Sequence, residues 1–182
     1  MACGLNKGRI EPCKDVVGGI KAVYFIDYGD ITINYDGTDV DVIDSFGDCD
    51  AYKYELKGNS SFEQTINASR ENGTTFFEQT LNLTLKKLSV ADHKELKFLA
   101  YGRPHIVVHD YNGNAFLMGA EHGADCNGGT IVTGAAMGDL SGYTLTFSAS
   151  EQLPANFLEG ATEADPFAGL AGTVTVTAGT DF

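Results

Sequence analysis

Apolar and polar residues alternate along residues 51–88, which predicts β-strands with one buried and one solvated face. From residue 52 to 67 the apolar side chains fall on even positions, and across 75–86 they fall on odd positions. The glycine-containing loop at 69–73 has the length of a hairpin connection. The sequence therefore predicts a long β-hairpin over residues 52–86.

The two arms of this hairpin carry similar motifs, FEQTIN at residues 62–67 and FEQTLN at residues 77–82. Pairing Glu63 directly with Glu78 would place like charges opposite each other, which is unfavourable in an antiparallel pair. The register with Glu63 opposite Thr80 and Phe62 opposite Leu81 avoids this repulsion. We therefore expect that register.

The length of the first arm is unusual. If residues 52–67 form one strand, it is roughly 50 Å long at ~3.3 Å per residue, whereas typical strands span ~17–20 Å. Gly58 leaves an alternative open, because it could break the arm into two strands. Since an isolated two-stranded ribbon is only marginally stable, the long hairpin is expected to continue into the sheet of another subunit.

The rest of the pattern predicts an all-β fold, a β-sandwich or barrel with one flanking α-helix. The helix is expected at residues 89–101, where Ser89 and Asp92 form a capping box, with Leu96, Leu99 and Ala100 on one face. The other expected strands lie at residues 22–28, 31–35, 38–43, 104–111, 115–120, 130–137, 141–150 and 173–178.

Three regions follow from this pattern. Residues 1–19 lack periodicity and are expected to form an irregular N-terminal arm, and residues 20–158 are expected to form one β domain. Residues 159–182 are expected to be a C-terminal extension, a Gly/Ala-rich loop followed by a strand with Val174 and Val176 facing inward.

The charge excludes one class of protein. The chain has 182 residues with 12 Lys and Arg against 25 Asp and Glu, a formal net charge of −13. A protein that grips nucleic acid needs a basic surface to displace phosphate counterions. All the Lys and Arg residues lie at or before Arg103, so the region after it contains Asp and Glu but no Lys or Arg. We therefore expect no tight binding to nucleic acid.

The beginning of the sequence has no apolar stretch long enough for a signal peptide, and no later stretch is long enough to span a membrane. We therefore expect folding in a cytosol. The four cysteines are irregularly spaced, which favours free thiols over a disulfide framework in that compartment. They are Cys3, Cys13, Cys49 and Cys126.

Candidate chemistry is sparse. His105 and His109 would lie ~13 Å apart on a strand, too far to share one ion. The best local metal candidate is a loop with four ligand-type side chains, Glu121, His122, Asp125 and Cys126. The aspartates between residues 36 and 50 lack the spacing of a calcium-binding loop. Since no nucleophile and base pair up either, we predict no metal, no cofactor and no enzymatic activity.

Three stretches of the chain resemble a known family. YKYELKGNSSFEQTINASRENGTTFFEQTLNLTLKKLS (52–89), HKELKFLAYGRPHIVV (93–108) and GAAMGDLSGYTLTFSASEQLPANFL (134–158) are similar to the tail tube, or major tail, proteins of tailed bacteriophages. The likeness is closest to the tail tube proteins of phages that infect Bacteroidetes-type hosts. It covers residues 20–158 and rests on general similarity and element order, because the family has no catalytic motif.

The resemblance implies a β-sandwich with a flanking helix that assembles as stacked hexameric rings. Four strands per subunit would join around the ring into an inner barrel that conducts double-stranded DNA. About 24 strands at ~4.7 Å, tilted ~40°, give a barrel roughly 45 Å across. The implied partners are further copies of the chain, tape-measure and tail-completion proteins, and DNA that passes without tight binding. The implied location is the virion tail, assembled in the bacterial cytoplasm without a membrane.

On this hypothesis the polar face of the 52–86 hairpin lines the lumen. The lumen-lining candidates are Lys53, Glu55, Lys57, Glu63, Thr65, Asn67, Glu78, Thr80, Asn82 and Thr84. The face is mixed in charge, because the two lysines offset the glutamates, whereas sliding DNA requires few cationic contacts. The candidates for contacts between rings are Arg70, Glu71, Thr173, Val174, Thr175 and Val176.

Two alternatives remain from the sequence. One is another virion structural protein of related fold, such as a tail-completion or capsid-decoration protein. The other is a calcium-dependent β-sandwich binding module that uses the acidic residues between 36 and 50.

Overall fold

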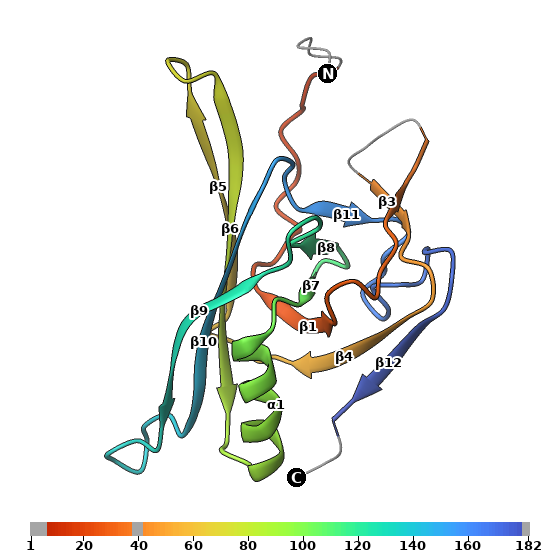
Figure 1. The fold of residues 1–182 in the computed structure, drawn as a ribbon. Helices are drawn as coiled ribbons and strands as arrows, with labels where there is room; N and C mark the ends of the chain where they lie inside the picture. The colour runs from red at the N-terminus through yellow and green to blue at the C-terminus, as the bar shows by residue number, and fades with distance from the viewer. Residues whose placement is uncertain (1–6, 38–41, 180–182) are drawn as a thin grey trace.

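The structure, a computed structural model, describes residues 7–37 and 42–179. It contains two β-sheets and one helix, so the predicted all-β fold with a flanking helix is confirmed (Figure 1). The larger sheet contains, in spatial order, β12 (Val174–Ala178), β4 (Cys49–Glu55), β1 (Ile20–Ile26), β7 (His105–Asp110), β8 (Ala115–Met118), β11 (Asn156–Leu158), β3 (Val42–Ser45) and β2 (Asn34–Tyr35). The smaller sheet contains β5 (Ser61–Ser69), β6 (Thr74–Lys86), β10 (Gly142–Glu151) and β9 (Asp125–Val132).

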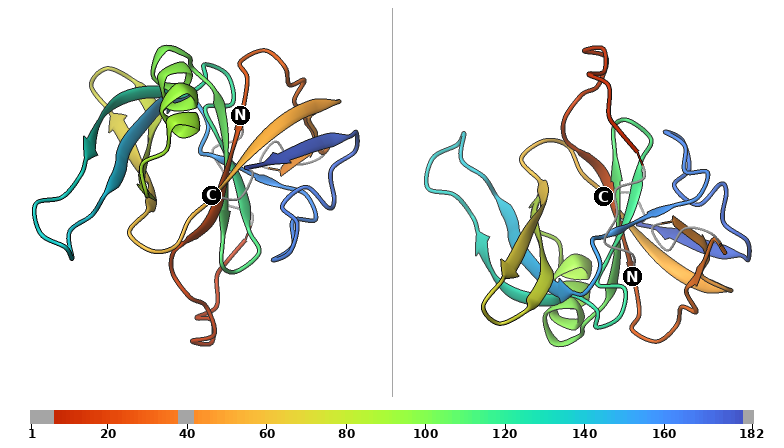
Figure 2. Two further views of the ribbon diagram at one scale, coloured as in Figure 1. Left: turned by 90° about the horizontal axis from the view of Figure 1, so that it is seen from below. Right: turned by 90° about the horizontal axis from the view of Figure 1, so that it is seen from above.

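The central strands of the larger sheet, β1 and β7, are buried on both faces. Along β1, Val23 and Phe25 face one apolar cluster and Tyr24 and Ile26 face another, which explains why this strand reads as a continuous apolar run. Figure 2 shows the smaller sheet to one side of the larger one. The first cluster fills the space between the two sheets.

The second cluster lies within the curl of the larger sheet, where the predicted loop at 159–172 covers it through Phe167 and Leu170. The chain then ties the ends of the sheet together. Ala171 bridges Ser45 of β3, and the carbonyl of Thr173 accepts the N–H of Cys49 at 3.1 Å. The C-terminal extension is thus integral to this half of the molecule.

The predicted continuous hairpin over 52–86 is wrong. Backbone φ angles of 75° at Gly58 and 55° at Asn59 turn the chain sharply, so β4 joins the larger sheet and β5 the smaller one. The alternative of a break at Gly58 is confirmed, and the hairpin consists of residues 61–86.

Within that shorter hairpin the predicted register is confirmed. Glu63 lies opposite Thr80, and Glu78 lies opposite Thr65 rather than opposite the other glutamate. Residues 70–73 form the turn between β5 and β6. The pairing therefore separates the two glutamates, as their repulsion requires.

The helix α1 (Val90–Tyr101) is also confirmed, with its predicted cap. The Ser89 hydroxyl accepts the backbone N–H of Asp92 at 3.0 Å, which satisfies one of the free donors at a helix start. Of the three residues predicted on the apolar face of the helix, Leu96 is buried, Leu99 is partly buried and Ala100 is exposed. The buried face of α1 is therefore narrower than predicted.

Two other expectations need correction. Val174 packs on the second cluster, but Val176 is exposed, because β12 is the outermost strand and one flank of it is uncovered. The strand expected at 130–137 is β9 and ends at Val132. Residues 38–41, which contain most of the strand expected at 38–43, lie outside the described residues.

The N-terminal arm has no helix or strand over residues 7–18. Its base is held at Val17, whose N–H donates to the Asn112 side-chain oxygen at 3.0 Å while the Asn112 amide donates back to the Val17 carbonyl at 2.7 Å. Among the described residues, no helix has the length and apolar character needed to cross a membrane.

Candidate functional site: the polar face of the four-stranded sheet

The smaller sheet packs one face on the body of the molecule and leaves the other face uncovered. Its strand pairs bring polar residues of all four strands onto the uncovered face, because side chains directly opposite each other lie on the same side of a sheet. Its members are Ser61, Glu63, Thr65, Asn67, Ser69, Thr74, Glu78, Thr80, Asn82, Thr84, Lys86, Asp125, Thr130, Thr144, Thr146, Ser148 and Ser150, and Phe76 and Val132 lie on the same side. We call this set the polar face.

Seven of the ten predicted lumen residues lie on the polar face: Glu63, Thr65, Asn67, Glu78, Thr80, Asn82 and Thr84. The other three are misplaced by the prediction of a continuous hairpin. Lys53 and Glu55 lie on β4 of the larger sheet, where they pair with each other at 2.6 Å, and Lys57 lies in the following turn. None of these three residues therefore lies on the polar face.

The charge of the polar face is set by few residues. With Lys53 and Lys57 removed, the basic residue that remains in its paired strand positions is Lys86, at the end of β6. The Lys86 ammonium group donates to the carbonyl of Lys57 at 3.1 Å. Glu63, Glu78 and Asp125 are exposed acidic groups on the same face. The polar face is therefore acidic and rich in hydroxyl and amide groups.

Many of these polar groups bond to one another. The Thr146 hydroxyl donates to the Asn82 side chain at 2.9 Å, and the Asn67 amide donates to Glu78 at 3.3 Å. Asn127, at an irregularity in β9, donates to Ser148. Cross-strand partners of this kind stabilise the sheet and leave fewer groups available to hold a ligand.

The contribution of β9 and β10 to the polar face was not predicted. The alternation in SGYTLTFSAS (141–150) gave a signal for a two-faced strand. Its partner could not be identified from the sequence, because β10 pairs with β6 across more than fifty residues of chain.

Both outer strands of this sheet are open edges. Among the described residues, β5 pairs with β6 alone, and β9 pairs with β10 alone. Exposed edges present unpaired backbone N–H and C=O groups that can pair with another chain. The site is therefore suited to extension by a further strand on either side.

The predicted inter-ring residues are far apart in the fold. Arg70 and Glu71 occupy the tip of the β5–β6 hairpin, which projects from the body in Figure 1. The other four candidates lie at one edge of the larger sheet, where Thr173 precedes β12 and Val174, Thr175 and Val176 belong to it. They form two separate surfaces.

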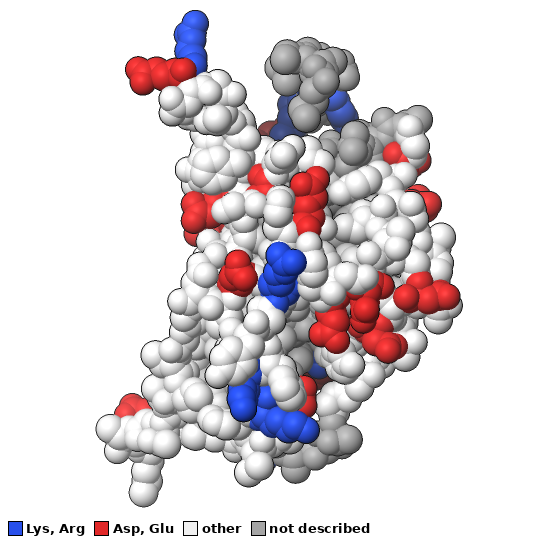
Figure 3. All heavy atoms as spheres, viewed as in Figure 1, with Lys and Arg blue, Asp and Glu red and all other residues white. Residues whose placement is uncertain are grey.

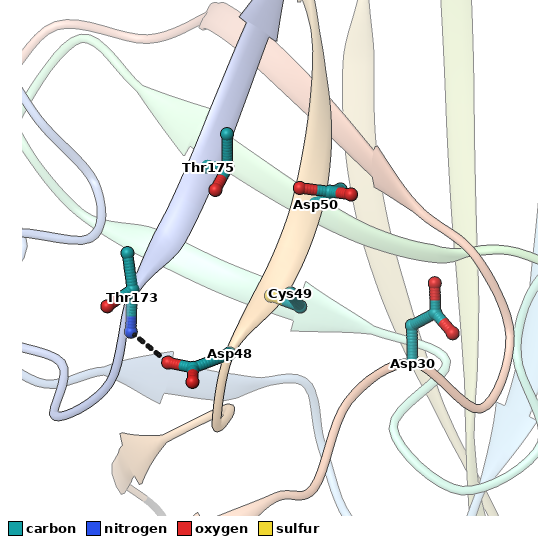
Figure 4. A pocket seen from close by; sticks show the side chains of 6 residues that line it. All are labelled: Asp30, Asp48, Cys49, Asp50, Thr173 and Thr175. Carbon is teal, nitrogen blue, oxygen red and sulfur yellow. Dashed lines mark hydrogen bonds between the residues drawn. The ribbon is translucent and has the colours of Figure 1, made fainter.

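The acidic stretch at 36–50 does not form one site within the described residues. Asp48 and Asp50 line an open pocket of about 610 Å³ with Asp30, Thr173 and Thr175 (Figure 4). Asp48 accepts the backbone N–H of Thr173 at 2.9 Å, so its carboxylate helps to fix β12. Acidic side chains gather over the right-hand side of the view in Figure 3, whereas basic ones gather lower down, where α1 lies.

The thiol of Cys49 also lines this pocket. Burial, together with the charges of Asp50 and Asp30, raises its pKa to about 11. A thiol is a nucleophile only as the thiolate, so Cys49 is poorly suited to covalent chemistry at neutral pH.

The predicted metal loop has a different partner from those expected. His122 and Glu121 approach Glu151 of β10, with ligand-type atoms within 4.8 Å of one another. The buried Glu151 carboxylate, whose side chain is 3% exposed, accepts the backbone N–H groups of Glu121 and His122 at 3.1 and 2.9 Å. Its second oxygen lies 3.0 Å from Nδ1 of His122. Both oxygens of the Glu151 carboxylate therefore have hydrogen-bond partners, and these bonds hold the loop against the smaller sheet.

His105 and His109 are both buried, and each bonds to a backbone carbonyl. His105 Nδ1 lies 2.6 Å from the Gly119 oxygen, and His109 Nε2 lies 2.9 Å from the Thr162 oxygen. Burial lowers the pKa of both side chains. They thus act as neutral hydrogen-bonding groups within the larger sheet.

The His122–Glu151 pair predicts a pH-dependent contribution to stability. The hydrogen bond and charge of Glu151 raise the pKa of His122. The contribution is complete below the unfolded-state pKa of about 6.5 and is lost as the pH rises through the folded-state pKa. His122→Ala should therefore lower the melting temperature more at about pH 6 than at about pH 8.5. Equal losses at the two pH values would contradict the pairing, and His93→Ala on α1 is the control.

No protein-family model matches this chain, and neither a curated protein nor a solved structure matches it.

Proposed function

We propose that this chain is a structural protein of a bacteriophage tail, which polymerises as stacked hexameric rings into a tube that conducts double-stranded DNA. The observation that carries the proposal is the four-stranded sheet with two open edges and an uncovered polar face. In this proposal the protein functions in the virion tail, with tape-measure and tail-completion proteins as further partners.

The direction of the strands supports ring formation. Every neighbouring pair in the smaller sheet is antiparallel, and the sheet has four strands, so β5 and β9 run in opposite directions. A second copy in the same orientation would therefore bring its β5 antiparallel to β9 of the first. Rotation about an axis can repeat this contact until the sheet closes and no edge remains.

The stagger of the strands also supports a barrel. The strand pairs relate the centre of each outer strand to a position on β6. Thr65, at the middle of β5, lies opposite Glu78 of β6. The residues at the middle of β9 lie, across β10, level with Asn82 and Leu83 of β6. This is a shift of about four to five residues over three strand spacings, which corresponds to a tilt of roughly 45°. Strands in closed barrels tilt by about 35–45°.

The polar face suits passage of DNA without retention. Cationic side chains bind phosphate by releasing counterions, and the polar face has Lys86 at one end as its basic residue in the paired positions. The acidic groups of the face repel phosphate, and its hydroxyl, amide and apolar groups offer phosphate only neutral contacts. Together with the net charge of −13, this composition supports a wall along which DNA slides.

Negative-stain microscopy and analytical ultracentrifugation of the purified protein test the proposal. Wild-type protein is expected to form rings or hollow tubes at high concentration. Ala68→Pro on β5 removes a backbone donor from an edge strand and should abolish rings, whereas Ala68→Ser should not. A wild-type chain that stays monomeric would overturn the proposal, and one whose melting temperature depends on calcium would favour a calcium-dependent binding module instead.

A further inference from the structure

The outer side of α1 carries apolar side chains that no described residue covers. Phe98 is 58% exposed and Tyr101 is 81% exposed, although both belong to the helix whose Leu96 is buried against the body. Exposed apolar side chains that lie side by side on one surface commonly mark a contact with another protein. The position of α1 in the fold indicates which protein would bind to this surface.

α1 lies beside an open edge of the smaller sheet. Of the strands of that sheet, α1 packs against β9, the outermost one. The helix lies on the body side of the sheet, where Tyr143 of β10 donates to the carbonyl of Ser89, which caps the helix. A strand added to the edge of β9 would therefore place its body-side residues next to α1.

The opposite edge of the same sheet carries a matching apolar residue. Ile66 of β5 pairs with Phe77 and lies on the body side of the sheet, yet it is 66% exposed because the hairpin projects beyond the body (Figure 1). Ile131 of β9 lies on the same side, opposite Tyr143, and is 58% exposed. Both open edges thus leave apolar groups uncovered on one side of the sheet.

We propose that the outer side of α1, through Phe98 and Tyr101, is the docking surface for the β5–β6 hairpin of a second copy of this chain, through Ile66. The inference rests on the proposed ring, in which β5 of one copy lies along β9 of the next. Pairing of the β5 and β9 backbones alone buries little side-chain surface, whereas stable interfaces bury about 1,200–2,000 Å² in total. The contact with α1 adds a second, apolar layer behind the paired strands.

The stagger of the sheet makes this contact geometrically consistent. If Thr65, at the middle of β5, lies opposite the polar-face residue Thr130 of β9, Ile66 falls opposite Gly129, a body-side position in the central part of β9. The chain enters α1 at Val90 near the end of β9 that contains Ile131, because Ser89 contacts Tyr143 and Tyr143 pairs with Ile131. The later residues of α1, including Phe98, therefore lie toward the part of β9 that Ile66 would approach.

The experiment compares four proteins with the wild type by sedimentation over a range of concentrations. They are Ile66→Asp, the double variant Phe98→Asp with Tyr101→Asp, the edge variant Ala68→Pro, and the control Ile10→Asp, which changes an exposed apolar residue of the N-terminal arm. The first two should require at least roughly tenfold more protein than wild type to form rings. The control should assemble as the wild type does.

The outcomes separate the docking surface from the proposed function. If wild type forms rings that Ala68→Pro abolishes, but the α1 double variant assembles normally, the docking surface is wrong and the ring stands. If wild type forms no ring, the proposed function fails and the docking surface fails with it. All substituted α1 and β5 side chains are exposed, so unchanged melting temperatures of the monomers will show that the variants fold.

Discussion

The triple variant Thr80→Lys, Thr146→Lys and Ser148→Lys is expected to retain double-stranded DNA when it is assembled. The three positions lie on the polar face, where Ser148 pairs with Thr80 and Thr146 pairs with Asn82. If each lysine neutralises one phosphate, three contacts make DNA binding strongly salt-dependent, with roughly a 40-fold loss of affinity between 50 and 200 mM salt. Co-sedimentation of labelled duplex with preassembled rings or tubes measures the effect.

The matched control keeps a hydroxyl group at each position and changes each side chain by one methyl group only, with Thr80→Ser, Thr146→Ser and Ser148→Thr. It should retain no more DNA than wild type. A wild-type assembly that already holds duplex as tightly as the lysine variant would contradict a wall along which DNA slides. An assembly in which lysines leave retention unchanged would show that the polar face does not meet the DNA.

Phe147→Ala is expected to cause the largest loss of stability. Phe147 of β10 is fully buried between the two sheets, and its ring lies 5.4 Å from that of Phe25 on β1. Truncation removes this contact and leaves a cavity, which typically costs about 3–5 kcal/mol. Urea unfolding should show a lower midpoint with an unchanged slope.

Ile131→Ala is the control for this measurement, because Ile131 faces the same side of the sheet but is mostly exposed. Its loss should be about 1 kcal/mol or less. If Phe147→Ala also costs less than about 1 kcal/mol, the two sheets do not depend on a shared core. A transition that splits into two steps would show that the sheets unfold separately.

Local patterns in the sequence were sufficient for elements whose determinants lie close together. The β5–β6 register follows from alternation and from the repulsion between Glu63 and Glu78. The start of α1 follows from the hydroxyl of Ser89. In each case the deciding residues lie within about twenty positions of one another, so the chain itself brings them together.

The break at Gly58 could not be determined in the same way. Even positions carry the apolar side chains both before and after this glycine, so the alternation keeps its phase across the turn. The assignment of β4 to the larger sheet depends on its pairing with β1 and β12. These partners lie far away along the chain, and the periodicity of one strand does not identify them.

By itself the sequence determined an all-β protein with one capped helix, a two-faced hairpin and a strongly acidic charge, because alternation, capping and composition are local properties. The tertiary structure alone decided the composition of the polar face. It moved Lys53 and Lys57 to other surfaces and added the hydroxyl groups of β9 and β10. It also left β5 and β9 as open edges. Which strands become neighbours depends on the burial of both cores together, and that is a property of the whole chain rather than of any segment.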